Sequence, residues 1–153
     1  PNFRKPHKSQ LKQVKSRIIE NISYADIVRG SDEDFQMIFG LKSPSEAFVE
    51  INKAGCKNLI YTANKKGVMI KTPKLSLNLH TEEISPVSTI GAGDNFNAGI
   101  VWTLLKEGIS KSKLSDLSES LWDKIGKSGI DFASDVCMSY DNYISKEFAE
   151  KLK

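Results

Sequence analysis

The chain has 153 residues, of which 39% are hydrophobic and 27% are charged, a composition typical of a folded globular protein. Its 22 basic and 19 acidic side chains give a net charge of +3, too small for bulk charge to drive binding to nucleic acid or to a membrane surface. Two cysteines exclude a disulfide framework and favour a cytoplasmic protein, and the sequence has no run of about 18 apolar residues that would predict a membrane span.

The first third of the chain predicts three helices and one strand. Apolar residues at helical spacing predict a helix over 8–22, with lysines on the opposite face. A short apolar run predicts a strand over 25–29. Ser31 is expected to cap a helix that has acidic residues in its first turn. The segment 43–46, with Pro44 in the first turn, is expected to start another, and each of the two helices is expected to end at the next glycine.

The middle of the chain predicts a hairpin and further strands. The apolar segment 58–62 predicts a strand, and 64–67 has the composition of a turn. Residues 68–71 are expected to return beside 58–62 as the second strand of the hairpin. The alternation over 74–80 predicts another strand, and 82–87 is a candidate for a short one.

The last third predicts helices over 91–107 and 114–133 and a short helix that begins after Ser145. Helices and apolar strands that alternate along a chain predict an α/β layered domain. We expect its sheet to be mostly parallel, with an antiparallel hairpin. The chain opens without a Met or a signal segment and ends on an amphipathic stretch, so we interpret it as the C-terminal piece of a longer protein.

The strongest chemical signal is the sequence Gly91-Ala92-Gly93-Asp94, at the point where a predicted strand gives way to a helix. Small residues let a ligand approach the backbone, and the N–H groups at a helix start bind anions. A carboxylate would repel a phosphate, so Asp94 suggests a base that takes a proton from an attacking hydroxyl. The alternative is a tight turn followed by an acidic first-turn residue, and the spacing matches neither Walker A nor G-x-G-x-x-G.

The segment from Gly91 to Gly99 resembles the C-terminal signature of the ribokinase-like sugar kinases, the PfkB family. Pro1-Asn2-Phe3-Arg4 resembles part of the Asp-Pro-Asn-x-Arg strand of fructokinase-like members. Residues 25–34 are similar to the region of the family's Asn-x-x-Glu motif, and residues 62–67 to its Thr-x-Gly-x-x-Gly turn. The resemblance covers nearly the whole chain.

The resemblance implies a ribokinase-like three-layer α/β/α sandwich, of which residues 1–153 would form a single domain. This domain would be the nucleotide-binding and catalytic half, and the N-terminal half, with most sugar-binding residues and a lid, would be absent. The implied reaction is ATP-dependent phosphorylation of a sugar hydroxyl, with fructose as the first candidate, and the 153-residue piece alone is expected to be inactive. A kinase for a ketodeoxy sugar acid or a nucleoside, and a non-catalytic nucleotide-binding or interaction module, stay open as alternatives.

The resemblance also assigns roles in catalysis. Asp94 would be the base, and the backbone amides of Gly91, Ala92 and Gly93 would form the anion hole for the transferred phosphoryl group. Asp34, at the acidic position of the Asn-x-x-Glu motif, would help to hold Mg²⁺ through water.

Nucleotide binding is assigned to a second set of residues. Thr62, Asn64 and Gly67 would lie near the ATP phosphates and ribose, and Asn97 would contact the nucleotide or stabilise the helix start. The implied partners are ATP and a small sugar, without nucleic acid or membrane, and a homodimer stays open.

The sequence departs from the family pattern at several positions. Ser88 stands where many members have an Asp that helps to bind a monovalent cation, so cation activation is open. Ser31 and Asp34 replace the usual Asn and Glu, and Asp is one methylene shorter. Asn64 replaces a Gly, but Asn tolerates a left-handed backbone, so the turn is expected to survive.

Overall fold

The computed structural model describes residues 11–153, which divide into two compact units, one ending at His80 and the other beginning at Thr81. The segment Pro1-Asn2-Phe3-Arg4, which resembles a family strand, lies outside the described residues. That residues 1–153 form a single domain stays a prediction.

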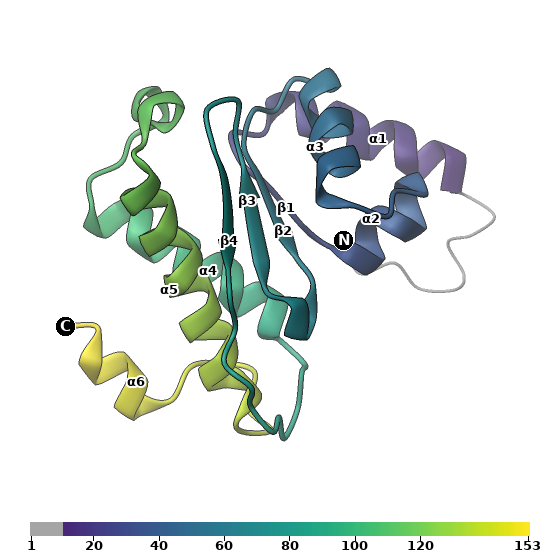
Figure 1. The fold of residues 1–153 in the computed structure, drawn as a ribbon. Helices are drawn as coiled ribbons and strands as arrows, with labels where there is room; N and C mark the ends of the chain where they lie inside the picture. Colours follow the sequence, from purple (N-terminus) through teal and green to yellow (C-terminus); the bar gives the residue numbers. More distant parts are fainter. Residues whose placement is uncertain (1–10) are drawn as a thin grey trace. The chain divides into compact units, whose positions relative to one another are not determined.

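The first unit is built on a four-stranded sheet with the order β1-β2-β3-β4 (Figure 1). The strands are β1 (Val28–Ser31), β2 (Leu59–Thr62), β3 (Val68–Lys71) and β4 (Ser76–Leu79). β1 pairs with β2 in parallel, and β2–β3 and β3–β4 are antiparallel, so the predicted hairpin is confirmed. The α/β class is also confirmed, but the described sheet is less parallel than expected. The connections from β2 to β3 and from β3 to β4 are too short for a crossover, which forces those neighbours to be antiparallel.

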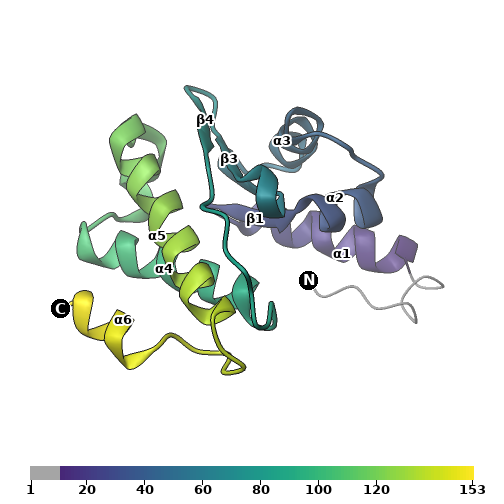
Figure 2. The same ribbon diagram turned by 60° about the horizontal axis from the view of Figure 1, so that its bottom comes forward.

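Three helices cover one face of this sheet (Figures 1 and 2): α1 (Leu11–Tyr24), α2 (Asp32–Phe39) and α3 (Pro44–Lys53). Their apolar sides meet those of the strands in a core that contains Ile22, Phe35, Ala47, Ile51, Cys56, Leu59 and Tyr61. The ring of Phe35 stacks on that of Tyr61, with 5.4 Å between centroids. Strand β1 begins at Val28, later than expected, because the Ala25 N–H closes a turn onto the Ile22 carbonyl.

The N-cap at Ser31 is confirmed, and Ser43 caps α3 in the same way. Both are capping boxes, in which the cap hydroxyl and the third helical side chain exchange hydrogen bonds with the backbone. At α2 the Asp34 N–H donates to Ser31 Oγ at 3.1 Å, and Asp34 Oδ2 accepts from the Ser31 N–H at 3.0 Å. Ser43 and Glu46 form the same pair of bonds at α3. The paired bonds fix where both helices begin.

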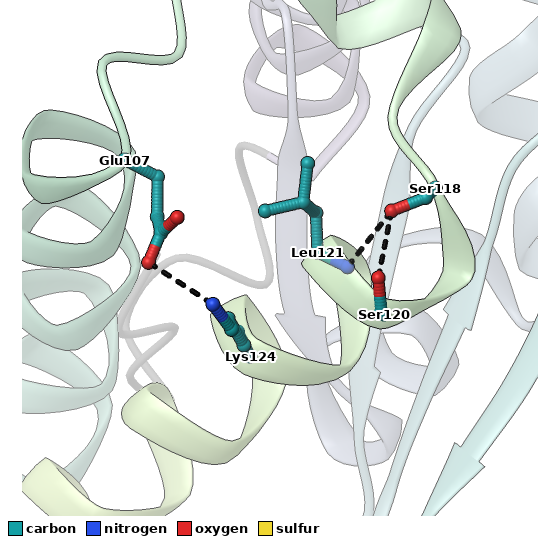
Figure 3. Close-up of polar contacts among 5 residues, drawn as sticks. All are labelled: Glu107, Ser118, Ser120, Leu121 and Lys124. Carbon is teal, nitrogen blue, oxygen red and sulfur yellow. Dashed lines mark hydrogen bonds and ion pairs between the residues drawn. The ribbon is translucent and has the colours of Figure 1, made fainter.

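The second unit contains α4 (Ala92–Lys106), α5 (Glu119–Cys137) and α6 (Lys146–Lys151), with a 3₁₀ segment, η3 (Lys111–Asp116), before α5. The candidate strand over 82–87 does not form, and at its end the Val87 N–H donates to the carbonyl of Cys137, the last residue of α5. Helix α5 begins later than predicted because Ser118 caps it, its Oγ accepting from the Leu121 N–H at 3.3 Å (Figure 3). Among the described residues, no helix is long and apolar enough to cross a membrane.

Helices α4 and α5 cross where Gly99 faces Ser128 and Gly129. A Cβ on Gly99 would lie 2.5 Å from the Ser128 carbonyl oxygen, and one on Gly129 would lie 2.7 Å from the Phe96 ring. The Ser128 hydroxyl donates to the Gly99 carbonyl at 3.1 Å. The glycine in the middle of α5 therefore permits close helix packing at the expense of helix propensity.

An exposed ion pair between Lys124 and Glu107, at 3.3 Å, also joins α5 to the residue that follows α4 (Figure 3). Exposed pairs of this kind stabilise a fold only weakly. The packing of the two helices therefore depends mainly on the glycine crossing and on the apolar side chains around it.

Candidate functional site

Gly91 begins helix α4 in a conformation that favours glycine. Its φ is 84° and its ψ is −9°, in the left-handed region, whereas N-cap residues usually have an extended backbone. A Cβ at this position would lie 3.0 Å from the Cβ of Asn142. Both the backbone conformation and the close neighbour therefore require glycine at the first position of the Gly-Ala-Gly-Asp turn.

The turn gathers the four residues assigned to catalysis at one helix N-terminus. Gly91 precedes α4, and Ala92, Gly93 and Asp94 form its first turn, where N–H groups have no carbonyl partner within the helix. The Ala92 N–H donates to the Thr89 carbonyl, but at 3.3 Å this bond is long. The Asp94 side chain is exposed. The structure thus places backbone donors and a solvent-accessible carboxylate within one turn of a 15-residue helix.

A residue that the sequence left unassigned holds this turn. Asn95 Nδ2 donates to the Gly91 carbonyl and to the Asn142 carbonyl, both at 3.0 Å. Asn97, the expected candidate for stabilising the helix start, is exposed on the next part of the helix. The motif contains two asparagines, Asn95 and Asn97, and the fold brings the Asn142 carbonyl beside Asn95.

Ser88, at the position where many family members have Asp, takes part in a local turn. Its Oγ accepts from the Ile90 N–H at 3.2 Å. This hydroxyl replaces a carboxylate in the segment that leads into the Gly-Ala-Gly-Asp turn.

In the first unit, the parallel strands β1 and β2 bring Ser31 and Thr62 opposite each other at their carboxyl ends. Thr62 is buried, and its Oγ1 accepts a hydrogen bond from Arg29 Nη2 at 3.1 Å. The same hydroxyl lies 3.5 Å from the Gly30 carbonyl. Arg29, which the sequence analysis did not single out, therefore orients the hydroxyl assigned to nucleotide binding.

The turn after Thr62 survives the replacement of Gly by Asn64, as expected. Asn64 has a φ of 46° and begins a short 3₁₀ segment, η2 (Asn64–Lys66). Gly67 closes the turn with a φ of 90°, and its carbonyl accepts from the Ala63 N–H at 2.9 Å. A Cβ on Gly67 would overlap the backbone carbonyl of Leu79, so the turn requires glycine there.

Asp34 has a structural role in the helix that it begins. Its Oδ2 accepts from both the N–H and the hydroxyl of Ser31, at 3.0 and 2.8 Å. The residues that the structure describes contain no group of three or more His, Cys, Asp or Glu side chains that could hold a metal ion. Asp34 is therefore the one capping carboxylate of α2, and Asp32 and Glu33 are two further acidic residues in the same first turn.

A groove of about 500 Å³ opens beside the same turn, within the first unit. Its lining includes Asp32 and Gln36 of α2, Tyr61 of β2 and both Lys66 and Gly67 of the turn. Burial, followed by the negative charges of Asp32 and Glu46, raises the pKa of Tyr61 above its usual value. The Tyr61 hydroxyl is thus held in its neutral form, which can donate as well as accept a hydrogen bond.

The candidate residues fall into two sets. Asp34, Thr62, Asn64 and Gly67 belong to the first unit, and Gly91, Ala92, Gly93, Asp94 and Asn97 belong to the second. In the first unit the carboxyl ends of β1 and β2 position the site residues, and in the second the start of α4 does.

Comparison with known proteins gives both a family and relatives of known activity. The profile of the pfkB family carbohydrate kinases matches residues 1–121. The chain is 30% identical over 122 residues to a fructokinase of Rhizobium leguminosarum bv. trifolii, a match that covers 78% of this chain and 36% of the relative. It is 30% identical over 93 residues to an ATP-dependent 6-phosphofructokinase of Thermoanaerobacterium thermosaccharolyticum, covering 61% of this chain and 29% of that protein.

Solved structures share the fold. A fructokinase of Vibrio cholerae superposes with a TM-score of 0.79 at 18% identity, over all of this chain and 49% of that one. An aminoimidazole riboside kinase of Salmonella enterica superposes with a TM-score of 0.77 at 16% identity, over 99% of this chain and 50% of that one. The chain therefore spans about a third of the length of the two sequence relatives and half of the length of these two structures. With the family profile matching 121 of its 153 residues, the chain belongs to the pfkB family of carbohydrate kinases.

Proposed function

We propose that this chain is the nucleotide-binding and catalytic half of a kinase that transfers the γ-phosphoryl group of ATP to a sugar hydroxyl. The observation that carries the proposal is the turn at the start of α4, where backbone donors without a carbonyl partner in the helix and the exposed Asp94 carboxylate occur together. Donors alone would suit phosphate binding, and the adjacent carboxylate adds the base that phosphoryl transfer to a hydroxyl requires.

In this proposal Asp94 takes the proton of the sugar hydroxyl as its oxygen attacks the γ-phosphorus. The N–H groups of Gly91, Ala92 and Gly93 donate to the phosphoryl oxygens, on which negative charge must be stabilised during transfer. The bond from Ala92 to the Thr89 carbonyl is long at 3.3 Å, so exchanging it for a shorter bond to a charged oxygen is favourable. The positive end of the α4 dipole adds to this stabilisation.

Nucleotide binding is assigned to the turn of the first unit, with Thr62, Asn64 and Gly67 near the phosphates and ribose, and to Asn97 of α4. The fixed hydroxyl of Thr62, oriented by Arg29, suits hydrogen bonding to a phosphate or ribose oxygen. Support comes from the fold neighbours. The Salmonella enterica kinase was solved with an ATP analogue and the Vibrio cholerae fructokinase with ADP.

Mg²⁺ is assigned to Asp34, and the donor set fits. Mg²⁺ keeps several waters and binds through one or two carboxylates and the substrate phosphates, so a single carboxylate suffices where no protein cage exists. When bound, Mg²⁺ neutralises charge on the phosphate oxygens. A ribokinase-like neighbour from E. coli was solved with ATP and Mg²⁺, and the Vibrio cholerae fructokinase with potassium. A monovalent cation is not assigned here, because Ser88 provides no charge.

Fructose or a related sugar is the proposed substrate. Fructokinases of Rhizobium leguminosarum bv. trifolii and Vibrio alginolyticus are 30% and 24% identical to the chain, and the Vibrio cholerae fructokinase was solved with fructose. A nucleoside is the second candidate, because the Salmonella enterica neighbour was solved with aminoimidazole riboside.

The test is ADP release by the complete protein with a panel of hexoses, pentoses, sugar phosphates and nucleosides, for the wild type and for Asp94→Asn. We expect sugar-dependent turnover that falls by about 10²–10⁴-fold in the variant, with ATP binding retained, because Asn keeps the shape but cannot accept the proton. The matched control is Glu119→Gln, which removes the same charge from the first turn of α5. An Asp94→Asn protein with more than half of the wild-type turnover would exclude Asp94 as the base, and a wild type that binds ATP without turnover would instead indicate a binding module.

A further inference from the structure

Asn95 joins the start of α4 to a loop that is distant in sequence. Its backbone N–H donates to the Gly91 carbonyl at 2.9 Å, and its side-chain Nδ2 donates to the same carbonyl at 3.0 Å. The second hydrogen of Nδ2 is donated to the Asn142 carbonyl, also at 3.0 Å. Both acceptors are carbonyls, which only the NH₂ end of the amide can satisfy, so the orientation of the side chain is fixed by chemistry.

The loop reached by Asn95, residues 138–144, is closed at its base. The N–H and the hydroxyl of Ser145, which begins α6, donate to the two carboxylate oxygens of Asp135 at 2.6 and 2.9 Å. Within the loop the Asp141 N–H donates to Ser139 Oγ at 3.0 Å. These bonds hold the segment between α5 and α6, and the Asn142 backbone lies against Gly91, 3.3 Å from where a Cβ on that glycine would be.

The position of the Gly91 carbonyl decides where one proposed anion-hole donor points. The Gly91 C=O and the Ala92 N–H belong to the same planar peptide unit and point in opposite directions. The backbone and side-chain N–H groups of Asn95 hold that carbonyl and thereby help to set the direction of the Ala92 N–H, which donates to the Thr89 carbonyl at 3.3 Å and in the proposed reaction exchanges that long bond for one to a phosphoryl oxygen. Without the side-chain bond, glycine at residue 91 lets the peptide unit rotate at lower cost.

We propose that Asn95 is a positioning residue, which aims the Ala92 N–H at the phosphoryl group and couples the 138–144 loop to the anion hole. The inference rests on the proposed function of the Gly91–Asp94 turn. Asn95 itself does not touch the reacting atoms. Its loss should therefore slow the transfer step and leave the binding of the sugar nearly unchanged.

The experiment compares Asn95→Leu with the wild type in the complete protein. Leu has nearly the same shape as Asn and no donor, so both side-chain bonds are lost without a change in charge. We expect kcat to fall by roughly 10- to 100-fold, the size of effect that misplaced catalytic groups produce, with KM for the sugar within twofold of wild type. The matched control is Asn21→Leu at an exposed position of α1, which should change neither quantity.

A second measurement separates this inference from the proposed function. Backbone hydrogen exchange, followed in peptides that cover 88–96 and 138–146, should become faster in both segments of Asn95→Leu and stay unchanged in Asn21→Leu. Asn95→Ser gives a milder variant, because its hydroxyl can still bond the Gly91 carbonyl one turn back but is too short for the bond to Asn142. It should retain more kcat than Asn95→Leu while exchange in 138–146 still rises.

The outcomes are distinct. A kcat within twofold of wild type in Asn95→Leu, or unchanged exchange in 138–146, would overturn the positioning role. A wild type that shows no turnover with any sugar would refute the proposed function, and the exchange of the two segments would then decide whether Asn95 couples them.

Discussion

Single residues in this chain carry roles that their type alone does not reveal. Asp34 is a capping carboxylate bonded twice by Ser31, so its proposed role at Mg²⁺ is added to one in helix stability. Gly93 differs from Gly91, because it lies inside the first turn of α4 and has a helical backbone. A side chain at Gly93 is therefore allowed by the backbone, and its effect would come from the space that it fills beside the helix N-terminus.

Gly93→Val provides the test at this scale. The branched side chain should cover the approach to the backbone donors, weakening ATP binding and lowering turnover while adenosine binding changes little, since adenosine has no phosphate. Parallel titrations of the complete protein with ATP and adenosine measure the difference. Ala98→Val, which adds the same bulk at an exposed position of α4, is the control. Equal weakening of both ligands would mean that the substitution disturbs the fold and that no phosphate site lies there.

At the scale of elements, several short connections in the first unit are fixed by capping bonds or by residues at positive φ. Capping boxes begin α2 and α3, and Gly40 ends α2 with a φ of 75°. The turn from β2 to β3 passes through Asn64 and Gly67 at positive φ, and its glycine is pressed against β4. The turn therefore contributes to the hairpin register together with the apolar alternation of the strands.

Gly67→Ala should destabilise the protein by at least about 2 kcal/mol, because an Ala at that backbone conformation is strained and its Cβ overlaps the Leu79 carbonyl. Gly40→Ala is the matched control, since it has a positive φ but no atom within 4 Å of the added Cβ, and it should cost about 1 kcal/mol. Urea unfolding of the two variants measures both values. Equal losses of stability would show that the contact with β4 contributes nothing.

At the scale of the whole molecule, the chain contains two compact units and spans about half of the length of the related kinase structures. In the proposed function, residues of this chain would bind nucleotide, accept a proton and stabilise charge. No group in the described residues is assigned to the sugar, which the family resemblance places in the other half of the kinase.

We expect the 153-residue chain alone to show no sugar kinase activity. Transfer requires the hydroxyl to be held in line with the γ-phosphoryl group, and loss of such positioning forfeits on the order of 7–11 kcal/mol of barrier lowering in favourable cases. The assay is ADP release with a sugar panel, with the chain and the complete protein side by side. Sugar-dependent turnover by the chain within tenfold of the complete protein would place the sugar site inside these 153 residues.

Much of the local structure could be predicted from the sequence because it depends on neighbours along the chain. Ser31 and Ser145 cap helices as expected, the segment 43–46 starts one, and Gly40 ends one, because capping involves residues only three or four apart. The helix start at the Gly-Ala-Gly-Asp turn was predicted for the same reason. The first residues of β1 and α5 were not predicted correctly. The turn onto Ile22 and the cap at Ser118 make these elements begin later than the apolar pattern suggests.

Contacts between residues far apart in sequence were decided only by the tertiary structure. The sequence pointed to Asn97 and left Asn95 unassigned, and the return of the 138–144 loop gave Asn95 a second carbonyl to bind. It offered Thr62 as a hydroxyl, and the parallel pairing of β1 with β2 placed Arg29 against it. Side-chain type determines what a residue can do chemically, and the packing of distant segments determines which partner it meets.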